Sequence, residues 1–503
     1  MMKKQFTIFS AAVLTLGLGS CSKSYFDINN NPNQATSASA QLVLPNALTT
    51  TASNQEVPFN FLSAWLGYLG QSGSYATGAG DIASYKQTTN SADGLWTNRY
   101  RNLADYDYIE KNAHKNKLPF YEAAAKIMKA FVFEQLVDMF NNIPYSQALQ
   151  GTNIITPKYD DAQSVYNAIT LQIDSAVILL GRPDAIGDKT YDVMFGKNFF
   201  GNSYKSALEN LYWMKFANTL KLRILLRQSQ VASQASFIQA EIAKITQNQA
   251  GFLDYDAGVN PGYSNNSGQQ NPQWGFFVTL TGNPTAGGGA DFWKANQYSI
   301  TWLTNHNDPR LPQIYKPGGA GMVGSVLGST NNPAGTNAAT PGPGILQGVN
   351  QSTIIISAAQ SYLMQAEADV RGLLGGNAVS DFDKGVQASF DYLGAGSSAA
   401  YVAQNDNQTN LSVAAGTSQQ LACIMRQEWI ADNQIDPFDA WSNYRRLHLP
   451  ADLPLSISPF LDQSPASIPI RFLYPTSEYN NNTANVSAQG TIDYHKSPVF
   501  WNQ

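Results

Sequence analysis

Five aromatic side chains stand in stretches without a regular hydrophobic pattern, where a ring can be left free to bind a ligand. One stretch covers residues 70–94 and the other covers residues 251–350, and both are rich in Gly and Thr. Flat rings cover the C–H face of a sugar and amides bond its hydroxyls, as in sites that place a few polar groups among apolar walls. The candidate ligand-binding residues are Tyr75, Tyr85, Trp274, Trp293, Asn296 and Tyr298. We expect two of the five aromatics to contact ligand, and for each of them a place in the core fits the sequence at least as well.

Residue patterns for catalysis are scarce. Glycoside hydrolysis needs only two carboxylates, and Asp436 and Asp439 are close in sequence. Because they stand beside Pro437 and Trp441, roles in a turn and a helix cap explain them better. The four histidines are scattered, none is paired at i and i+4 as in a helical metal site, and no Gly-x-Ser-x-Gly sequence occurs. The sequence therefore gives an enzyme no positive support, and we predict no catalytic residue.

Two partial motifs for cofactors or metals fail on their context. Gly319–Gly324 matches the G-x-G-x-x-G fingerprint of dinucleotide sites, but residues 325–344 predict no helix that could hold a pyrophosphate. Asp27–Asn33 resembles the start of a calcium loop, but Pro32 stands where the loop needs Gly and Ala38 where it needs Glu. We predict no cofactor and no metal ligand, and the sequence leaves open whether calcium is bound.

The N-terminus has the pattern of a secretory signal. Lys3 and Lys4 precede an apolar run that ends at Leu18, too short to span a bilayer. Leu18-Gly19-Ser20-Cys21 resembles the lipobox of bacterial lipoproteins, which implies that residues 1–20 are removed and that Cys21 is acylated. More than one acyl chain makes such an anchor stable. We expect residues 21–40 to be a tether between the lipid and the fold.

Composition narrows the possible ligands. Only 13% of the residues are charged, the net charge is −5, and no basic block occurs, so nucleic-acid binding is not expected. Such a surface suits neutral polar ligands. With Cys21 acylated, Cys423 is the one remaining cysteine, which excludes an internal disulfide, and its apolar neighbours predict a buried thiol.

Helical periodicity predicts a mainly α fold that must position the aromatic residues. Residues 119–140 give the clearest helix, because apolar residues recur at three- and four-residue steps over a stripe wide enough to be covered on several sides. Other helices are expected in 41–69, from 96 on, and in 161–180, 204–230, 233–247, 354–373, 379–393 and 418–433. We divide the chain into scaffold segments 41–250 and 351–449, an irregular lobe at 251–350 and a C-terminal segment 450–503 that packs on the scaffold. Paired helices with short turns suggest tetratricopeptide-like stacking, although no 34-residue period is present.

Six further segments carry a resemblance to a known family. They are Asn29–Asn33, Phe140–Ser146, Asn307–Pro312, Ser361–Ala368, Arg426–Arg446 with its Trp-x-x-x-Arg-Arg sequence, and Ile468–Glu478. In this order, and together with the lipobox, they resemble the SusD/RagB family of nutrient-binding outer-membrane lipoproteins. Asn31 departs from the family pattern, which usually has Asp at this position.

The resemblance implies a fold, a role and a partner. It implies a tetratricopeptide-like scaffold whose irregular lobe carries the ligand site, and a SusC-like TonB-dependent transporter that the lipoprotein caps. Members bind glycans in many cases and peptides in others, without catalysis. The family motifs are mainly structural, so we expect four charged residues to tie the C-terminal segment to the helices. These residues are Arg445, Arg446, Arg471 and Glu478.

The resulting hypothesis is a non-catalytic binding lipoprotein, anchored in the outer membrane and facing the cell exterior. It captures oligosaccharide or polysaccharide and passes it to the transporter. Three alternatives stay open at this point: a surface glycoside hydrolase or lyase with unpaired carboxylates, a peptide-binding member of the same family, and a helical scaffold without a small ligand.

Overall fold

The structure is a computed structural model that describes residues 38–75 and 80–502. The predicted lipidation site Cys21, the signal segment and the tether up to residue 37 lie outside the described residues. Within those residues, no helix is both long and apolar enough to cross a bilayer.

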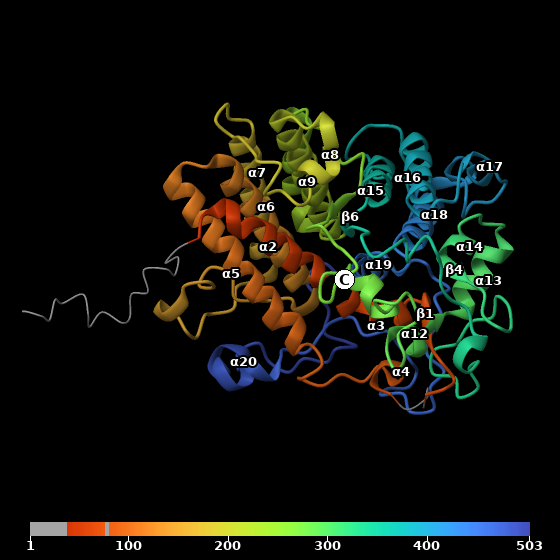
Figure 1. The fold of residues 1–503 in the computed structure, drawn as a ribbon. Helices are drawn as coiled ribbons and strands as arrows, with labels where there is room; N and C mark the ends of the chain where they lie inside the picture. The colour runs from red at the N-terminus through yellow and green to blue at the C-terminus, as the bar shows by residue number, and fades with distance from the viewer. Residues whose placement is uncertain (1–37, 76–79, 503) are drawn as a thin grey trace, which may run out of the picture. The chain divides into compact units, whose positions relative to one another are not determined.

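The first half of the scaffold is a row of antiparallel helices (Figure 1). Helix α6 contacts both α5 and α7, and α7 contacts α9, which explains why the apolar stripe of α6 is wide. The helix runs from Pro119 to Phe140 as predicted, and Asn141 leaves it with a φ of +67°. The elements of this half are α2 (Ala40–Ser53), α3 (Asn60–Trp65), β1 (Leu69–Gln71), α4 (Asp81–Ser84), α5 (Asp93–Asn116), α6 (Pro119–Phe140), α7 (Ala162–Leu180), α8 (Lys197–Phe200), α9 (Ser206–Arg227) and α10 (Ala235–Gln247).

The lobe is built from short elements joined by loops. Its strands form two-stranded antiparallel sheets, in which β1 pairs with β3, β2 with β6 and β4 with β5. The absence of a long helical period in the sequence is explained by these short elements. They are β2 (Ala257–Val259), α11 (Pro272–Phe277), α12 (Gly289–Phe292), β3 (Trp293–Ala295), α13 (Gln297–Asn305), α14 (Leu311–Ile314), β4 (Tyr315–Lys316), β5 (Thr340–Pro341) and β6 (Thr353–Ile356).

The second half of the scaffold returns to long helices. The prediction of a helix from residue 354 is wrong at its start, because Ile354–Ile356 belong to β6 and Ser357 begins α15 with a capping box. Helix α15 contacts α16, α18 and α9, so the two halves pack on each other. The elements are α15 (Ala358–Val370), α16 (Ala378–Leu393), α17 (Ala399–Val402), α18 (Gly416–Ala431), α19 (Pro437–Leu447), α20 (Thr476–Asn481) and α21 (Thr483–Ser487).

The C-terminal segment is tied to the scaffold by charged side chains, as expected. Arg445 donates to the carbonyls of Asp138 (2.7 Å) and Ile470 (2.9 Å), and Arg471 donates to the carbonyl of Phe140. Glu478 accepts a hydrogen bond from Tyr159 (2.8 Å). Arg446 differs, since it joins scaffold helices to one another by pairing with Glu367 of α15 at 2.6 Å.

Burial of the Cys423 thiol is also confirmed. Its residue is 0% exposed and lies among apolar side chains of the second scaffold half. The largest apolar cluster joins residues of the first scaffold half, such as Phe131, to residues of the lobe, such as Trp302.

Candidate functional site

The pairing of β1 with β3 brings together the two stretches that carry the candidate aromatics. Gln71 lies opposite Trp293 in this ladder, and the amide of Ser72 donates to the carbonyl of Phe292 at 2.8 Å. The loop after β1 therefore lies against α12, although the two are more than 200 residues apart in sequence.

Tyr75 is held at the surface of this junction. Its side chain is 37% exposed, and its ring meets the ring of Phe292 edge to face with a centroid distance of 5.1 Å. The loop before it is fixed by the Ser74 hydroxyl, which accepts from the amide of Gly335 at 2.8 Å. Gly73 has no room for a side chain, because a Cβ would lie 1.9 Å from a backbone oxygen of Asn332. The tight loop therefore holds the ring of Tyr75 against Phe292 and leaves part of the Tyr75 ring exposed to solvent.

Helix α11 adds further rings beside α12. Asn271 caps α11 by accepting from the amide of Trp274 at 2.9 Å, and α11 contacts α12. The ring of Phe276 packs so closely on Gly289 that a Cβ there would lie 2.4 Å from it. Phe276, Phe292 and Trp274 are all half-buried. We call Tyr75, Phe276 and Phe292 the aromatic face, and Trp274, two residues before Phe276 on α11, points to another side of that helix.

The other predicted site residues have structural partners. Tyr85 is 1% exposed, and its hydroxyl accepts from the amide of Ser456 at 2.9 Å. Trp293 and Asn296 are also buried. The Asn296 side chain caps α13 and donates to the carbonyl of Leu69 at 3.1 Å. These contacts hold the loop and the lobe together, and a role of these residues in ligand binding stays a prediction.

Tyr298 lies at the edge of the same region. It is half-buried, and its hydroxyl accepts from Arg426 at 2.9 Å. Burial raises its pKa, although the guanidinium beside it acts in the opposite direction. The structure thus brings Tyr75 close to Phe292 and Trp293, while Tyr298 turns toward α18.

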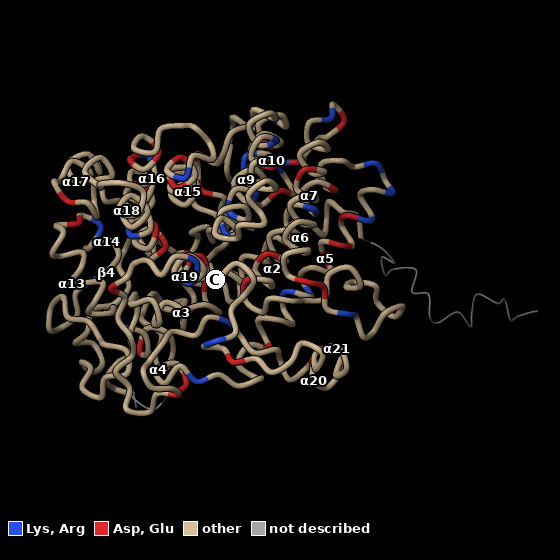
Figure 2. The backbone as a smooth tube through the Cα atoms, turned by 180° about the vertical axis from the view of Figure 1, so that it is seen from behind, with Lys and Arg blue, Asp and Glu red and all other residues tan. Residues whose placement is uncertain are grey.

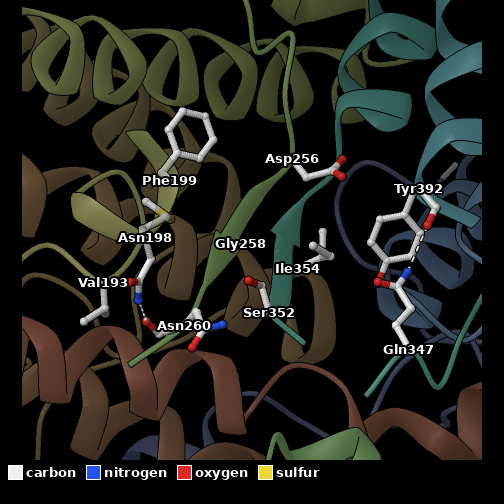
Figure 3. Close-up of a pocket in the computed structure, with 11 residues that line it drawn as sticks. Val193, Asn198, Phe199, Asp256, Gly258, Asn260, Gln347, Ser352, Ile354 and Tyr392 are labelled. Atoms are coloured by element: carbon white, nitrogen blue, oxygen red, sulfur yellow. Dashed lines mark hydrogen bonds between the residues drawn. The ribbon is translucent and has the colours of Figure 1, made fainter. Parts of the chain in front are cut away.

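A separate pocket opens where the lobe meets the scaffold (Figure 3). Its volume is about 360 Å³, within the range of small-molecule sites. Figure 3 shows Phe199 and Tyr392 on opposite sides of it, with amide, hydroxyl and carboxylate groups between them. The lining residues are Val193, Met194, Asn198, Phe199, Asp256, Gly258, Asn260, Gln347, Ser352, Ile354 and Tyr392.

The polar groups of this pocket are partly engaged with the protein. Asn198 donates to the carbonyl of Asn260 at 2.8 Å, and Gln347 donates to the carbonyl of Tyr392 at 2.9 Å. Burial raises the pKa of Asp256, which accepts from the amide of Ala358 at 2.8 Å. Sequence reasoning missed this pocket, because its walls come from four separate segments and no periodic pattern marks them.

The carboxylate pair considered for catalysis is buried in the scaffold. Asp436 and Asp439 are each 2% exposed. Asp436 caps α19 by accepting from the amide of Asp439 at 3.1 Å, and Asp439 accepts a hydrogen bond from Arg227 at 2.5 Å. Burial raises the pKa of Asp436 to about 6. The interpretation as cap residues is confirmed, and neither carboxylate is open to a substrate.

Charge is sparse around the aromatic face. Figure 2 shows frequent acidic and basic positions along α5, α7, α9 and α10 and fewer of them around α3 and α13, although Asp81 begins α4 and Asp291 lies in α12 next to Phe292. The rings and neutral polar groups of the lobe interact with uncharged ligands without a desolvation penalty for ions.

The fold defines a class: a tetratricopeptide-like helical scaffold with an inserted loop-rich lobe. A SusD-like family model described as "Starch-binding associating with outer membrane" matches residues 32–475. This chain belongs to the SusD-like family, whose members are binding proteins. The predicted mainly α fold and the family resemblance are thereby confirmed.

Solved structures support the fold. A chitin-binding SusD homologue from Flavobacterium johnsoniae matches with a TM-score of 0.75 at 21% identity, over 92% of this chain and 98% of that one. A SusD homologue from Bacteroides uniformis gives 0.74 at 22% identity, over 92% and 99% of the chains. A structure described as a chitin-binding protein gives 0.71 at 25% identity, over 92% and 99%. A search of curated proteins found no match.

Proposed function

We propose that this protein is a non-catalytic lipoprotein that binds oligosaccharide or polysaccharide at the cell surface and delivers it to a SusC-like TonB-dependent outer-membrane transporter. The family supports a nutrient-binding role, and two of the similar structures are described as chitin-binding. The observation that carries the proposal is the exposed ring of Tyr75, which is supported edge-on by Phe292.

The chemistry of the aromatic face fits a sugar. Tyr75 can stack on the C–H face of a pyranose, and Phe276 extends the apolar surface, because its ring packs on Gly289 of α12. A wall of rings with neutral polar neighbours binds uncharged, hydroxyl-rich molecules, because rings supply large contact area with few rotatable bonds. Burial of Asp436 and Asp439, the two carboxylates considered for catalysis, supports a role in binding.

Affinity gel electrophoresis of the purified protein against plant, fungal and bacterial polysaccharides tests the ligand class. Chitin fragments and starch are the first ligands to try, because they are the ligands named for the family and for two similar structures. We expect retardation by at least one glycan, with no release of reducing ends. Retardation by none, together with binding of a peptide mixture, would favour the peptide-binding alternative.

The anchor and the transporter are tested in cells. Cys21→Ser is expected to move the protein from the outer-membrane fraction to the soluble fraction, because the acylated residue is lost. A TonB-dependent barrel is expected to copurify with the wild-type protein from solubilised membranes. An unlipidated wild-type protein, free in the periplasm, would contradict the proposal.

A further inference from the structure

The connection between α18 and α19 contains three buried carboxylates that face one another. Glu428 lies near the end of α18, and Asp432, four residues later, caps it, so both project from the same side of the helix. Asp439 lies in the first turn of α19. All three residues are 1–2% exposed, and one carboxylate oxygen from each lies within 4.8 Å of the other two.

Among the residues that the structure describes, the buried acids around the cluster form ion pairs or hydrogen bonds, whereas Glu428 and Asp432 of the cluster do not. The ion pairs are Glu134 with Arg223, Asp138 and Asp439 with Arg227, and Glu367 with Arg371 and Arg446. Asp436 accepts hydrogen bonds from the amides of Gln55 and Gln360. In contrast, neither oxygen of Glu428 or Asp432 has a hydrogen-bond partner within residues 38–75 and 80–502.

Four unpartnered carboxylate oxygens in a protein interior are costly in either protonation state. If the groups are ionised, burial of each charge costs several kcal/mol, and the guanidinium groups of Arg227 and Arg446 nearby offset only part of that cost. If they are protonated, each O–H group is a buried donor without an acceptor, which costs about 1–3 kcal/mol. A cation bound between the oxygens removes both penalties.

We propose that Glu428, Asp432 and Asp439 bind a calcium ion. The donors are carboxylate oxygens without His or Cys, a set that suits hard cations rather than zinc. Ca²⁺ takes oxygens at about 2.3–2.6 Å, so ligands on opposite sides of one ion are separated by about 4.6–5.2 Å. The three oxygens lie within 4.8 Å of one another, which is compatible with that geometry. The two unpaired carboxylates also match the charge of a divalent ion.

Asp439 can coordinate the ion and keep its hydrogen bonds to the protein. Its oxygens accept from Arg227 and from Asn443 (2.9 Å), and each carboxylate oxygen has a second lone pair. The Arg227 contact fixes the position of Asp439 beside Glu428 and Asp432.

The site lies where the scaffold meets the lobe, which gives the ion a structural role. Next to Glu428, Trp429 donates to the carbonyl of Leu66 at 3.0 Å and its carbonyl accepts from Tyr68 at 2.6 Å. Next to Asp432, Asn433 donates to the hydroxyl of Tyr315 at 2.9 Å. Figure 2 shows acidic and basic positions beside α19. An ion that holds the end of α18 in place therefore also stabilises the contacts of Trp429 with Leu66 and Tyr68, and the contact of Asn433 with Tyr315.

Metal content and thermal unfolding of the purified full chain test the proposal. We expect about one calcium ion per chain by inductively coupled plasma mass spectrometry, since the cluster fits one ion. EDTA is expected to lower the Tm relative to CaCl₂, because a ligand of the folded state alone stabilises it. In Glu428→Gln/Asp432→Asn, whose side chains keep their shape, both the bound calcium and the EDTA effect should disappear.

Glu209→Gln is the matched control. Glu209 is also buried and has an oxygen without a partner in the described part of the chain, but it belongs to no cluster of three acidic groups among the described residues. Its replacement should leave calcium content and the EDTA effect unchanged. Wild-type protein without metal and with the same Tm in EDTA and CaCl₂ would overturn the proposal, whether or not the double variant folds. Stoichiometric binding of another metal would overturn the assignment to calcium.

Discussion

The scaffold and the β1–β3 junction bury polar groups in different ways. Between scaffold helices, guanidinium groups pair with carboxylates, as Arg446 does with Glu367 at 2.6 Å. At the β1–β3 junction, side-chain amides bond backbone carbonyls, as Asn296 does with Leu69 at 3.1 Å. Charge fixes helix packing inside the scaffold and also pairs Asp308 with Arg310 inside the lobe at 2.7 Å, whereas the β1–β3 junction beside Tyr75 is held by neutral amide groups.

The largest effect is expected when a scaffold ion pair is broken. Arg446→Ala leaves Glu367 buried with Arg371 as its remaining cation, and loss of one partner of a buried pair costs about 3–5 kcal/mol. Chemical denaturation measures the change. Arg182→Ala removes an exposed pair with Asp184 and should leave the free energy of unfolding almost unchanged. Equal losses in the two variants would contradict the structural role of the buried charges.

A pH series tests the boundary between scaffold and lobe. Burial raises the pKa of Glu56 from 4.5 to about 8. The folded state therefore holds this proton more tightly than the unfolded state does, and the resulting stability is complete below pH 4.5 and is lost as the pH rises through about 8. Glu56→Gln lacks this dependence, so its stability relative to wild type should rise between pH 5 and 8, by roughly 1.4 kcal/mol per pKa unit at most. A constant difference across this range would contradict the raised pKa.

A smaller effect on stability is expected at Tyr85, which follows β1 as Tyr75 does but is buried. Tyr85→Phe removes the hydroxyl that accepts from the amide of Ser456, so we expect a loss of about 1 kcal/mol of stability and unchanged glycan affinity. Thermal unfolding and affinity electrophoresis measure the two quantities. A loss of affinity at constant stability would instead make Tyr85 a ligand contact.

The smallest effect is expected in the pocket of Figure 3. Asn198 is exposed, and its amide bonds the carbonyl of Asn260. Asn198→Ala should change stability within about 0.5 kcal/mol and leave binding at the aromatic face intact. A clear drop in glycan affinity would move the ligand site from the aromatic face to this pocket.

Local signals explain which parts of the fold could be predicted. The bounds of α6 follow from Pro119 at its start, a continuous apolar period and Pro144 beyond its end. The strand at Ile354–Ile356 was missed, because a short apolar run before a helix fits either structure. The aromatic face could be predicted in part: Tyr75 stands out in a patternless stretch, but Phe276 and Phe292 join it only through the packing of α11 and α12. The carboxylate cluster could not be predicted, because it forms only when the turn between α18 and α19 brings Asp439 to Glu428 and Asp432, and no periodic pattern marks that turn.

Glycan affinity of Tyr75→Ala, compared with that of Tyr108→Ala, tests the central claim most directly. Both tyrosines are 37% exposed, but Tyr75 lies on the aromatic face of the lobe and Tyr108 lies on scaffold helix α5. We predict that Tyr75→Ala lowers affinity for the retarding glycan about tenfold, or ~1.4 kcal/mol, without a change in Tm, and that Tyr108→Ala leaves affinity unchanged. Unchanged affinity in Tyr75→Ala, or an equal loss in both variants, would contradict recognition by the lobe.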